Sequence, residues 1–181
     1  EAIWDSKANA HNPMMDHKGR LWLTSRIRGD QTPAFCQDGN LHPSAKLFPV
    51  KTTTRNLSFY DPQSKKWTLI DTCFSTHHLM FAEDANHTLW TSGGAGASQV
   101  IGWLNTKMFE ETGDEAKSQG WAPLVLDTNG NGKVDAWTEP NHPVDPSKDM
   151  RIAPTIYGVA PSKDGSVWGT QLGFPGRLLR V

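Results

Sequence analysis

Residues 127–135 are the part of this sequence whose side chains are spaced most clearly for metal chemistry. They read Asp-Thr-Asn-Gly-Asn-Gly-Lys-Val-Asp, with oxygen-bearing side chains at the first, third, fifth and ninth positions. A hard cation such as Ca²⁺ prefers such oxygen ligands, together with the backbone carbonyl of the seventh residue and a glycine at the sixth, where the chain turns. The predicted ligands are Asp127, Asn129, Asn131, Lys133 through its carbonyl, Asp135 and Glu139, which lies one residue beyond the twelfth position.

The flanks of this loop do not predict the helices of an EF-hand. Residues 124–126 and 134–137 read as strands, so the motif is typical of a nine-residue calcium hairpin. Two asparagines replace aspartates, which lowers the negative charge and predicts a modest affinity. The same residues are also explained by a metal-free turn, because Asn-Gly is a strong turn signal by itself.

A second candidate site consists of aromatic and imidazole side chains near the predicted starts of three strands. Neutral imidazoles bind transition metals, and His11 or His78 could act as a general base near neutral pH. Counted back from the nearest tryptophan, His11 corresponds to Leu79 and His78 to Ala10, which predicts that one of the two histidines points away. The alternative is that these imidazoles bond to backbone carbonyls in loops. The members are His11, His77, His78 and Tyr157.

Two arginines and two cysteines complete the candidate residues. Arg26 and Arg28 follow a predicted strand and could clamp a carboxylate or phosphate, because guanidinium groups match planar anions; pairing with acidic neighbours is the alternative. Cys36 and Cys73 lie in loops expected at the same face, which predicts a disulfide, although two unrelated buried thiols would fit as well. A disulfide and a calcium loop both favour a secreted or periplasmic protein.

Three repeated hairpin patterns indicate how these residues are positioned. Each is an apolar stretch, a polar turn and then Leu-Trp or Val-Trp, and the turns carry Asp, Asn or Gly, which tolerate tight hairpin geometry. The tryptophans are Trp22, Trp90 and Trp168. A further hairpin over residues 57–71 follows the first, so four short strands occur in order, as in one β-propeller blade.

The sequence therefore predicts an all-β fold with about two and a half four-stranded blades of a six- or seven-bladed β-propeller. The expected blade units lie near residues 11–71, 77–137 and 155–181 of a single partial domain, 1–181, with insertions at 30–56, 106–120 and 129–152. The second insertion predicts a short amphipathic turn or helix, and residues 1–6 predict the outer strand of a preceding blade. An antiparallel sandwich is the alternative fold. An incomplete ring would be completed by the rest of a longer protein or by another chain.

The Asp-x-x-Gly-x-Leu-Trp hairpin, followed by Phe59-Tyr-Asp-Pro, resembles the blades of the virginiamycin B lyase-like, gluconolactonase-like group of bacterial β-propellers. The resemblance implies a propeller ring. It also implies, as one alternative, a lyase- or hydrolase-type enzyme with a metal and histidines at the mouth of the central channel. Propeller motifs of this kind recur with unrelated functions, so a calcium-binding module for a small-molecule or anionic ligand, or for a protein partner, is the principal expectation.

Composition excludes several classes of protein. The chain has 181 residues, a formal net charge of −1, and 20% charged residues, so neither a disordered chain nor a nucleic-acid partner is indicated. No apolar run approaches the roughly 18 residues needed to span a bilayer.

Overall fold

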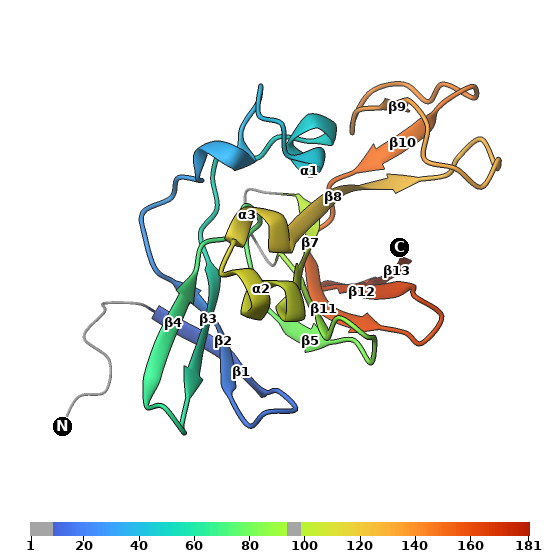
Figure 1. Ribbon diagram of the computed structural model, residues 1–181. Helices are drawn as coiled ribbons and strands as arrows, with labels where there is room; N and C mark the ends of the chain where they lie inside the picture. Colours follow the sequence, from blue (N-terminus) through green and yellow to red (C-terminus); the bar gives the residue numbers. More distant parts are fainter. Residues whose placement is uncertain (1–8, 94–98) are drawn as a thin grey trace.

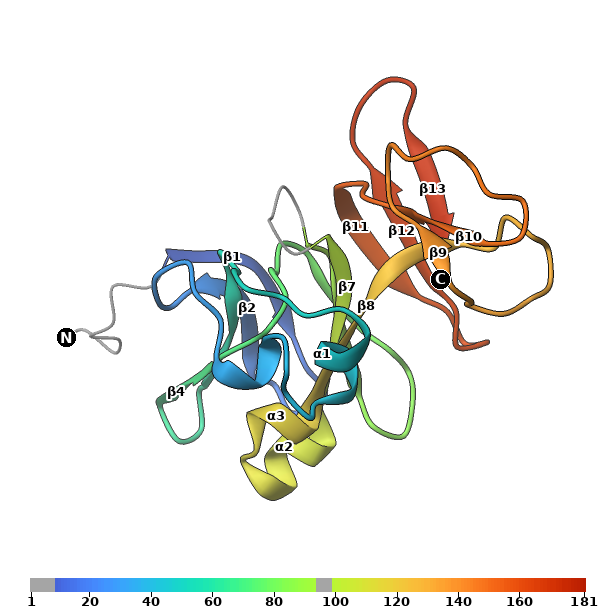
Figure 2. The same ribbon diagram turned by 90° about the horizontal axis from the view of Figure 1, so that it is seen from above.

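The computed structural model describes residues 9–93 and 99–181; the strand expected over residues 1–6 lies outside them. The chain is all-β, as predicted, and its strands form three separate sheets (Figure 1). In both views β7 lies between the first sheet and the third (Figure 2). In the described part of the chain, we find no helix with the length and apolar character needed to cross a membrane.

The first sheet has four antiparallel strands in chain order, as the sequence indicates for residues 11–71. Its turn at Asp16–Gly19 is closed by backbone bonds from Asp16 to Arg20 and from Gly19 to Asp16, with Gly19 at a φ of 74°. The strands are β1 (Asn9–Met15), β2 (Leu21–Arg26), β3 (Asn56–Asp61) and β4 (Lys66–Ile70).

The second sheet departs from the expected blade because it has six strands and is mixed. After four antiparallel strands the chain returns, so that β10 pairs antiparallel with β8 and parallel with β9. In sheet order the strands are β5 (Leu79–Phe81), β6 (Thr88–Thr91), β7 (Val100–Asn105), β8 (Gln119–Leu126), β10 (Asp149–Ile152) and β9 (Trp137–Thr138).

The third sheet contains β11 (Ile156–Pro161), β12 (Val167–Gln171) and β13 (Arg177–Arg180), in that order. The β-propeller prediction is wrong: the three sheets are separate, none closes or curls, and the second is neither four-stranded nor wholly antiparallel. The physical reason is that the repeated turn residues specify hairpins, which occur in any antiparallel sheet. They do not specify how successive sheets are arranged.

Short helices occupy the first two insertions. Residues 30–56 contain a 3-10 turn, η1 (Ala34–Cys36), and α1 (Pro43–Leu47). Residues 106–120 contain α2 (Thr106–Thr112) and α3 (Glu115–Ser118), as predicted, before entering β8. The Asn105 side chain caps α2 by accepting a bond from the Met108 N–H at 2.9 Å, and Gly113 ends it at a φ of 66°.

Buried side chains join the sheets in three clusters. The first joins sheets one and two, through Trp22, Leu57, Phe59, Ile70, Leu79, Leu89 and Leu104. The second surrounds the predicted disulfide, and the third joins sheets two and three, through Ile101, Leu124, Ile156, Val159 and Val167. Phe74 in the second cluster lies against Gly102 of β7, where an added Cβ would come within 2.1 Å of the ring.

The cysteines form a disulfide, so that prediction is confirmed. Cys36 and Cys73 are both fully buried, and their Cα atoms are 5.2 Å apart. The β2–β3 connection and the segment after β4 leave the first sheet at the same end, because neighbouring strands are antiparallel. The crosslink therefore attaches the η1–α1 insertion to the chain that leads toward β5.

Candidate functional site

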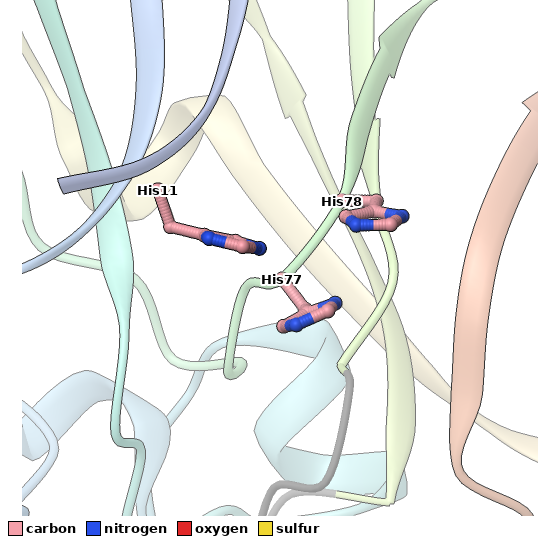
Figure 3. A group of neighbouring side chains, drawn as sticks. All are labelled: His11, His77 and His78. Atoms are coloured by element: carbon pink, nitrogen blue, oxygen red, sulfur yellow. The ribbon is translucent and has the colours of Figure 1, made fainter.

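The structure brings three histidines together at the junction of the first and second sheets. His11 belongs to β1, whereas His77 and His78 directly precede β5, and His11 extends toward His77 (Figure 3). One nitrogen from each imidazole lies within 4.8 Å of one nitrogen from each of the others. Tyr157 of β11 packs its ring edge-to-face on His78, with centroids 4.3 Å apart, and lies 5.0 Å from His77.

Two fully buried hydroxyl residues hold the backbone of this histidine cluster. The Thr24 hydroxyl donates to the carbonyl of His77 at 2.8 Å and lies 3.1 Å from that of His11, which joins β1, β2 and the segment before β5. Ser92 accepts the His77 N–H on its carbonyl at 2.7 Å and donates its own N–H to His78 at 2.8 Å. Its hydroxyl also donates to the carbonyl of Tyr157, so all three sheets meet at the cluster.

The expectation that one of the two histidines points away is wrong because β1 contains a bulge. The β1–β2 register shifts between His11 and Met14, and Asn12 adopts a φ of 44°. The extra residue places His11 opposite Thr24, two residues after Trp22, just as His78 lies opposite Ser92, two residues after Trp90. The Asn-Pro pair at 12–13 is the sequence signal, since Asn tolerates positive φ and Pro donates no ladder bond.

The imidazole nitrogens are suited to bind a metal rather than the protein backbone. His11 Nε2 and His77 Nδ1 are buried and have no hydrogen-bond partner among the residues that the structure describes, 9–93 and 99–181. Burial, together with the neighbouring histidines, lowers the pKa of His77 and of His78 below the usual value of 6.5. Both imidazoles therefore favour the neutral form, which is the form that coordinates metal ions.

The two arginines proposed as an anion clamp are engaged within the protein. Arg26 forms an exposed ion pair with Asp30. Arg28 pairs with Asp71 at 2.7 Å and donates to Thr53 at 2.7 Å, with longer bonds to Asn56 and Thr72. The structure thus places them with acidic and polar neighbours, the alternative left open by the sequence.

The acidic loop 127–135 is held by hydrogen bonds to the side chain of its first residue, Asp127, but it is not a hairpin. Asp127 accepts the N–H groups of Gly130, Asn131 and Gly132 at 2.7, 3.1 and 2.8 Å. The expected strand over 134–137 is reduced to β9, which pairs with β10 and not with β8. The loop therefore connects two strands that are not neighbours. Asn129 and Asn131 stay within this turn, where their side-chain oxygens accept the N–H groups of Asn131 and Lys133.

Glu139, the last predicted ligand, forms hydrogen bonds with Arg151 and Trp137 and not with the loop. Its Oε2 accepts bonds from the Arg151 guanidinium at 2.6 and 2.8 Å, and its Oε1 accepts the Trp137 indole N–H at 2.9 Å. The Arg151 bond, opposed by slight burial, lowers the pKa of Glu139.

Sequence reasoning missed Asp149, the first residue of β10. Its side chain is buried, with the residue only 1% exposed. Oδ2 accepts the N–H of Asp135 at 2.8 Å, whereas Oδ1 has no hydrogen-bond partner in the described segments 9–93 and 99–181. Asp149 lies 14 residues beyond Asp135 in the chain, and no spacing rule connects it to the loop.

Comparisons of the chain with protein-family models, with curated proteins and with solved structures found no match.

Proposed function

We propose that this protein is a transition-metal-binding module in which His11, His77 and His78 coordinate an ion such as Zn²⁺. The proposal rests on the approach of three imidazole nitrogens to within 4.8 Å of one another. Two buried imidazole nitrogens have no hydrogen-bond partner in the described part of the chain. A buried polar atom without a partner is unfavourable, so a ligand that satisfies two of them at once stabilises the fold.

The donor type and spacing favour zinc over a hard cation. Imidazole nitrogen suits Zn²⁺, Cu²⁺, Fe²⁺ and Ni²⁺, whereas Ca²⁺ and Mg²⁺ prefer oxygen. Zn–N bonds of 2.0–2.1 Å in a tetrahedral site bring nitrogens to about 3.4 Å from one another. Side-chain rotations that move each imidazole nitrogen by roughly 1 Å therefore suffice to reach this separation. The backbone need not move, because Thr24 and Ser92 already hold it in place.

Three protein ligands leave one tetrahedral position for an exogenous ligand. Such a position suits a carboxylate or another anionic group from a small molecule or a protein partner. Tyr157, whose ring packs against His78, is the aromatic neighbour of the cluster. The buried disulfide supports a secreted or periplasmic setting, because disulfides persist in oxidising compartments.

The open position also favours one second candidate, a hydrolase-type enzyme. Catalytic zinc sites keep three protein ligands and a water whose pKa falls to about 7, whereas structural sites are closed by four. Zinc-dependent hydrolysis of p-nitrophenyl acetate, lost in the histidine variants below, would support this candidate. An inactive protein that still binds zinc would support the binding module alone.

Isothermal titration calorimetry of the metal-free protein with ZnCl₂ tests the proposal. We expect one site, and a loss of affinity of at least about 100-fold in the double variant His11→Gln/His77→Gln. The matched control is His17→Gln, which removes an exposed imidazole outside the cluster. His17 stacks on His87 with ring centroids 3.9 Å apart. Absence of zinc binding in the wild-type protein, or equal affinity in the double variant, would refute the site.

A further inference from the structure

We propose that Asp149 supplies the remote carboxylate of a Ca²⁺ site whose other ligands lie in the loop 127–135. This site is separate from the histidine cluster and does not depend on the function proposed for it. The loop and Asp149 come from two segments that the third insertion brings together, as the chain leaves β8 and returns through β10.

The loop provides the oxygen donors but does not identify a metal by itself. Asp127 accepts three backbone N–H groups, and the Asn131 side chain bonds to both Lys133 N–H and the Asp135 carboxylate. These bonds fold the segment around its first residue, and a metal-free turn would contain them too. Evidence that distinguishes a metal site from a metal-free turn must therefore come from residues outside the loop.

That observation is the buried carboxylate of Asp149. One of its oxygens accepts the Asp135 N–H at 2.8 Å, so the side chain is directed at the end of the loop. Its other oxygen is buried and has no hydrogen-bond partner among the residues that the structure describes. Taking an ionised carboxylate out of water is strongly unfavourable unless a cation or several donors compensate.

The nearest cationic side chains along β10 are already paired. Arg151, the next residue on the same face of the strand, bonds to Glu139 and to Gln99. Lys148 pairs with Asp145 at 3.4 Å. A cation bound between Asp149 and the loop would therefore provide the missing compensation, and Glu139 is excluded from that role by its bonds to Arg151.

The resulting donor set matches calcium in number and hardness. In the described residues the carboxylates of Asp127, Asp135 and Asp149 are not gathered as the three histidine nitrogens are, so the loop would close on Asp149 when the ion binds. Three carboxylates, two amide oxygens and one backbone carbonyl provide six oxygen atoms or more, within the six to eight that Ca²⁺ takes. The two neutral asparagines and the exposed loop place the expected affinity in the range of extracellular modules, roughly 10⁻⁴–10⁻³ M. The ligands are Asp127, Asn129, Asn131, Lys133 through its carbonyl, Asp135 and Asp149.

The test is a CaCl₂ titration of the whole chain by calorimetry, with terbium luminescence sensitised by the neighbouring Trp137 as a second readout. Asp149→Asn keeps the shape and the acceptor for the Asp135 N–H but removes the charge. We expect it to weaken calcium binding at least tenfold, whereas the matched control Glu139→Gln stays within about twofold. No calcium binding by the wild-type protein, equal binding by Asp149→Asn, or an equal loss in Glu139→Gln would overturn the assignment.

Thermal unfolding in EDTA and in calcium separates a ligand from a structural residue. If Asp149 is a ligand, Asp149→Asn unfolds in EDTA at the wild-type temperature or above it, because the unpaired buried charge is gone. Added calcium then raises the melting temperature of the wild-type protein but not of the variant. A variant that is less stable than wild type in EDTA would show that the carboxylate serves the fold without a metal, and would overturn the proposal.

Discussion

The histidine cluster and the acidic loop are both candidate metal sites, but they are constructed in opposite ways. The proposed ligands of the cluster come from β1 and from a segment 66 residues later in the chain (77 − 11), and buried Thr24 and Ser92 hold both backbones in place. The loop takes most of its ligands from nine consecutive residues that are largely exposed, with Asp149 alone coming from elsewhere.

This difference determines what binding requires of each site. Nitrogen ligands on hydrogen-bonded strands are preorganised, so their affinity depends on the integrity of the sheets. Oxygen ligands on an exposed loop are ordered by the ion itself, so their affinity depends mainly on charge and ligand number. Changes to the first sheet, which lies away from β10 in the sheet order, should therefore affect zinc binding and leave calcium binding unchanged.

The largest expected effect follows removal of the disulfide. The double variant Cys36→Ser/Cys73→Ser releases a loop that spans 37 residues, which should lower the free energy of unfolding by about 3–4 kcal/mol in the chain-entropy model. Cys73 lies four residues before His77, so zinc affinity should fall as well, whereas calcium affinity should not. Chemical denaturation and parallel zinc and calcium titrations measure the three quantities.

If the folded variant lost zinc affinity and calcium affinity together, both sites would depend on the same scaffold. That result would contradict the distinction drawn between them. Wild-type protein treated with reductant is the control for the serine substitutions, since the same crosslink is lost without a change in sequence.

A smaller effect is expected from the β1 bulge. Asn12 adopts a φ of 44°, and its side-chain oxygen accepts the Leu79 N–H at 3.0 Å, which connects β1 to β5 beside the histidines. Asn12→Ala should cost about 1–2 kcal/mol, from the lost bond and from the strain of positive φ, and should weaken zinc binding several-fold. Asn12→Gly keeps the backbone freedom and loses only the bond, so it should be the milder change.

If Asn12→Ala folds and binds zinc as tightly as the wild-type protein, the bulge does not position His11. Denaturant unfolding and calorimetry provide both measurements, and calcium titration again serves as the internal reference.

The features that the sequence predicts correctly are local. The sequence correctly predicts the four-strand order of the first sheet, the helical insertion within residues 106–120 and the disulfide. All three follow from turn residues, periodicity and antiparallel connectivity. The disulfide prediction is correct although the β-propeller prediction is wrong, because it depends only on the first sheet. The β2–β3 connection with Cys36 and the segment after β4 with Cys73 leave that sheet at the same end.

The features that it misses are non-local. Trp22, Trp90 and Trp168 occupy equivalent hairpin positions, yet Trp22 is fully buried and Trp168 is 37% exposed, because each sheet meets different neighbours. Hairpin similarity therefore cannot establish how sheets pack. The same limit applies to the sites: His11 and His78 come together through a bulge, and Asp149 reaches the loop through a strand return that no spacing rule encodes.

The smallest effect expected concerns Asp16, which accepts backbone N–H groups as Asp127 does but in a buried setting. Burial raises the pKa of Asp16, but bonds from the Trp22 indole at 2.8 Å and from Arg20 outweigh it, so the pKa lies below 3.8. Ionised Asp16 thus stabilises the fold above pH 3.8, and this contribution, about 1 kcal/mol, is lost as pH falls through the lowered pKa. Denaturant unfolding between pH 5 and pH 2 should show a steeper loss of stability in wild type than in Asp16→Asn. If Asp16→Asn follows the wild-type curve instead, the bonds from Trp22 and Arg20 to the buried carboxylate would add nothing to stability, and burial in the first sheet would not make Asp16 a stabilising charge.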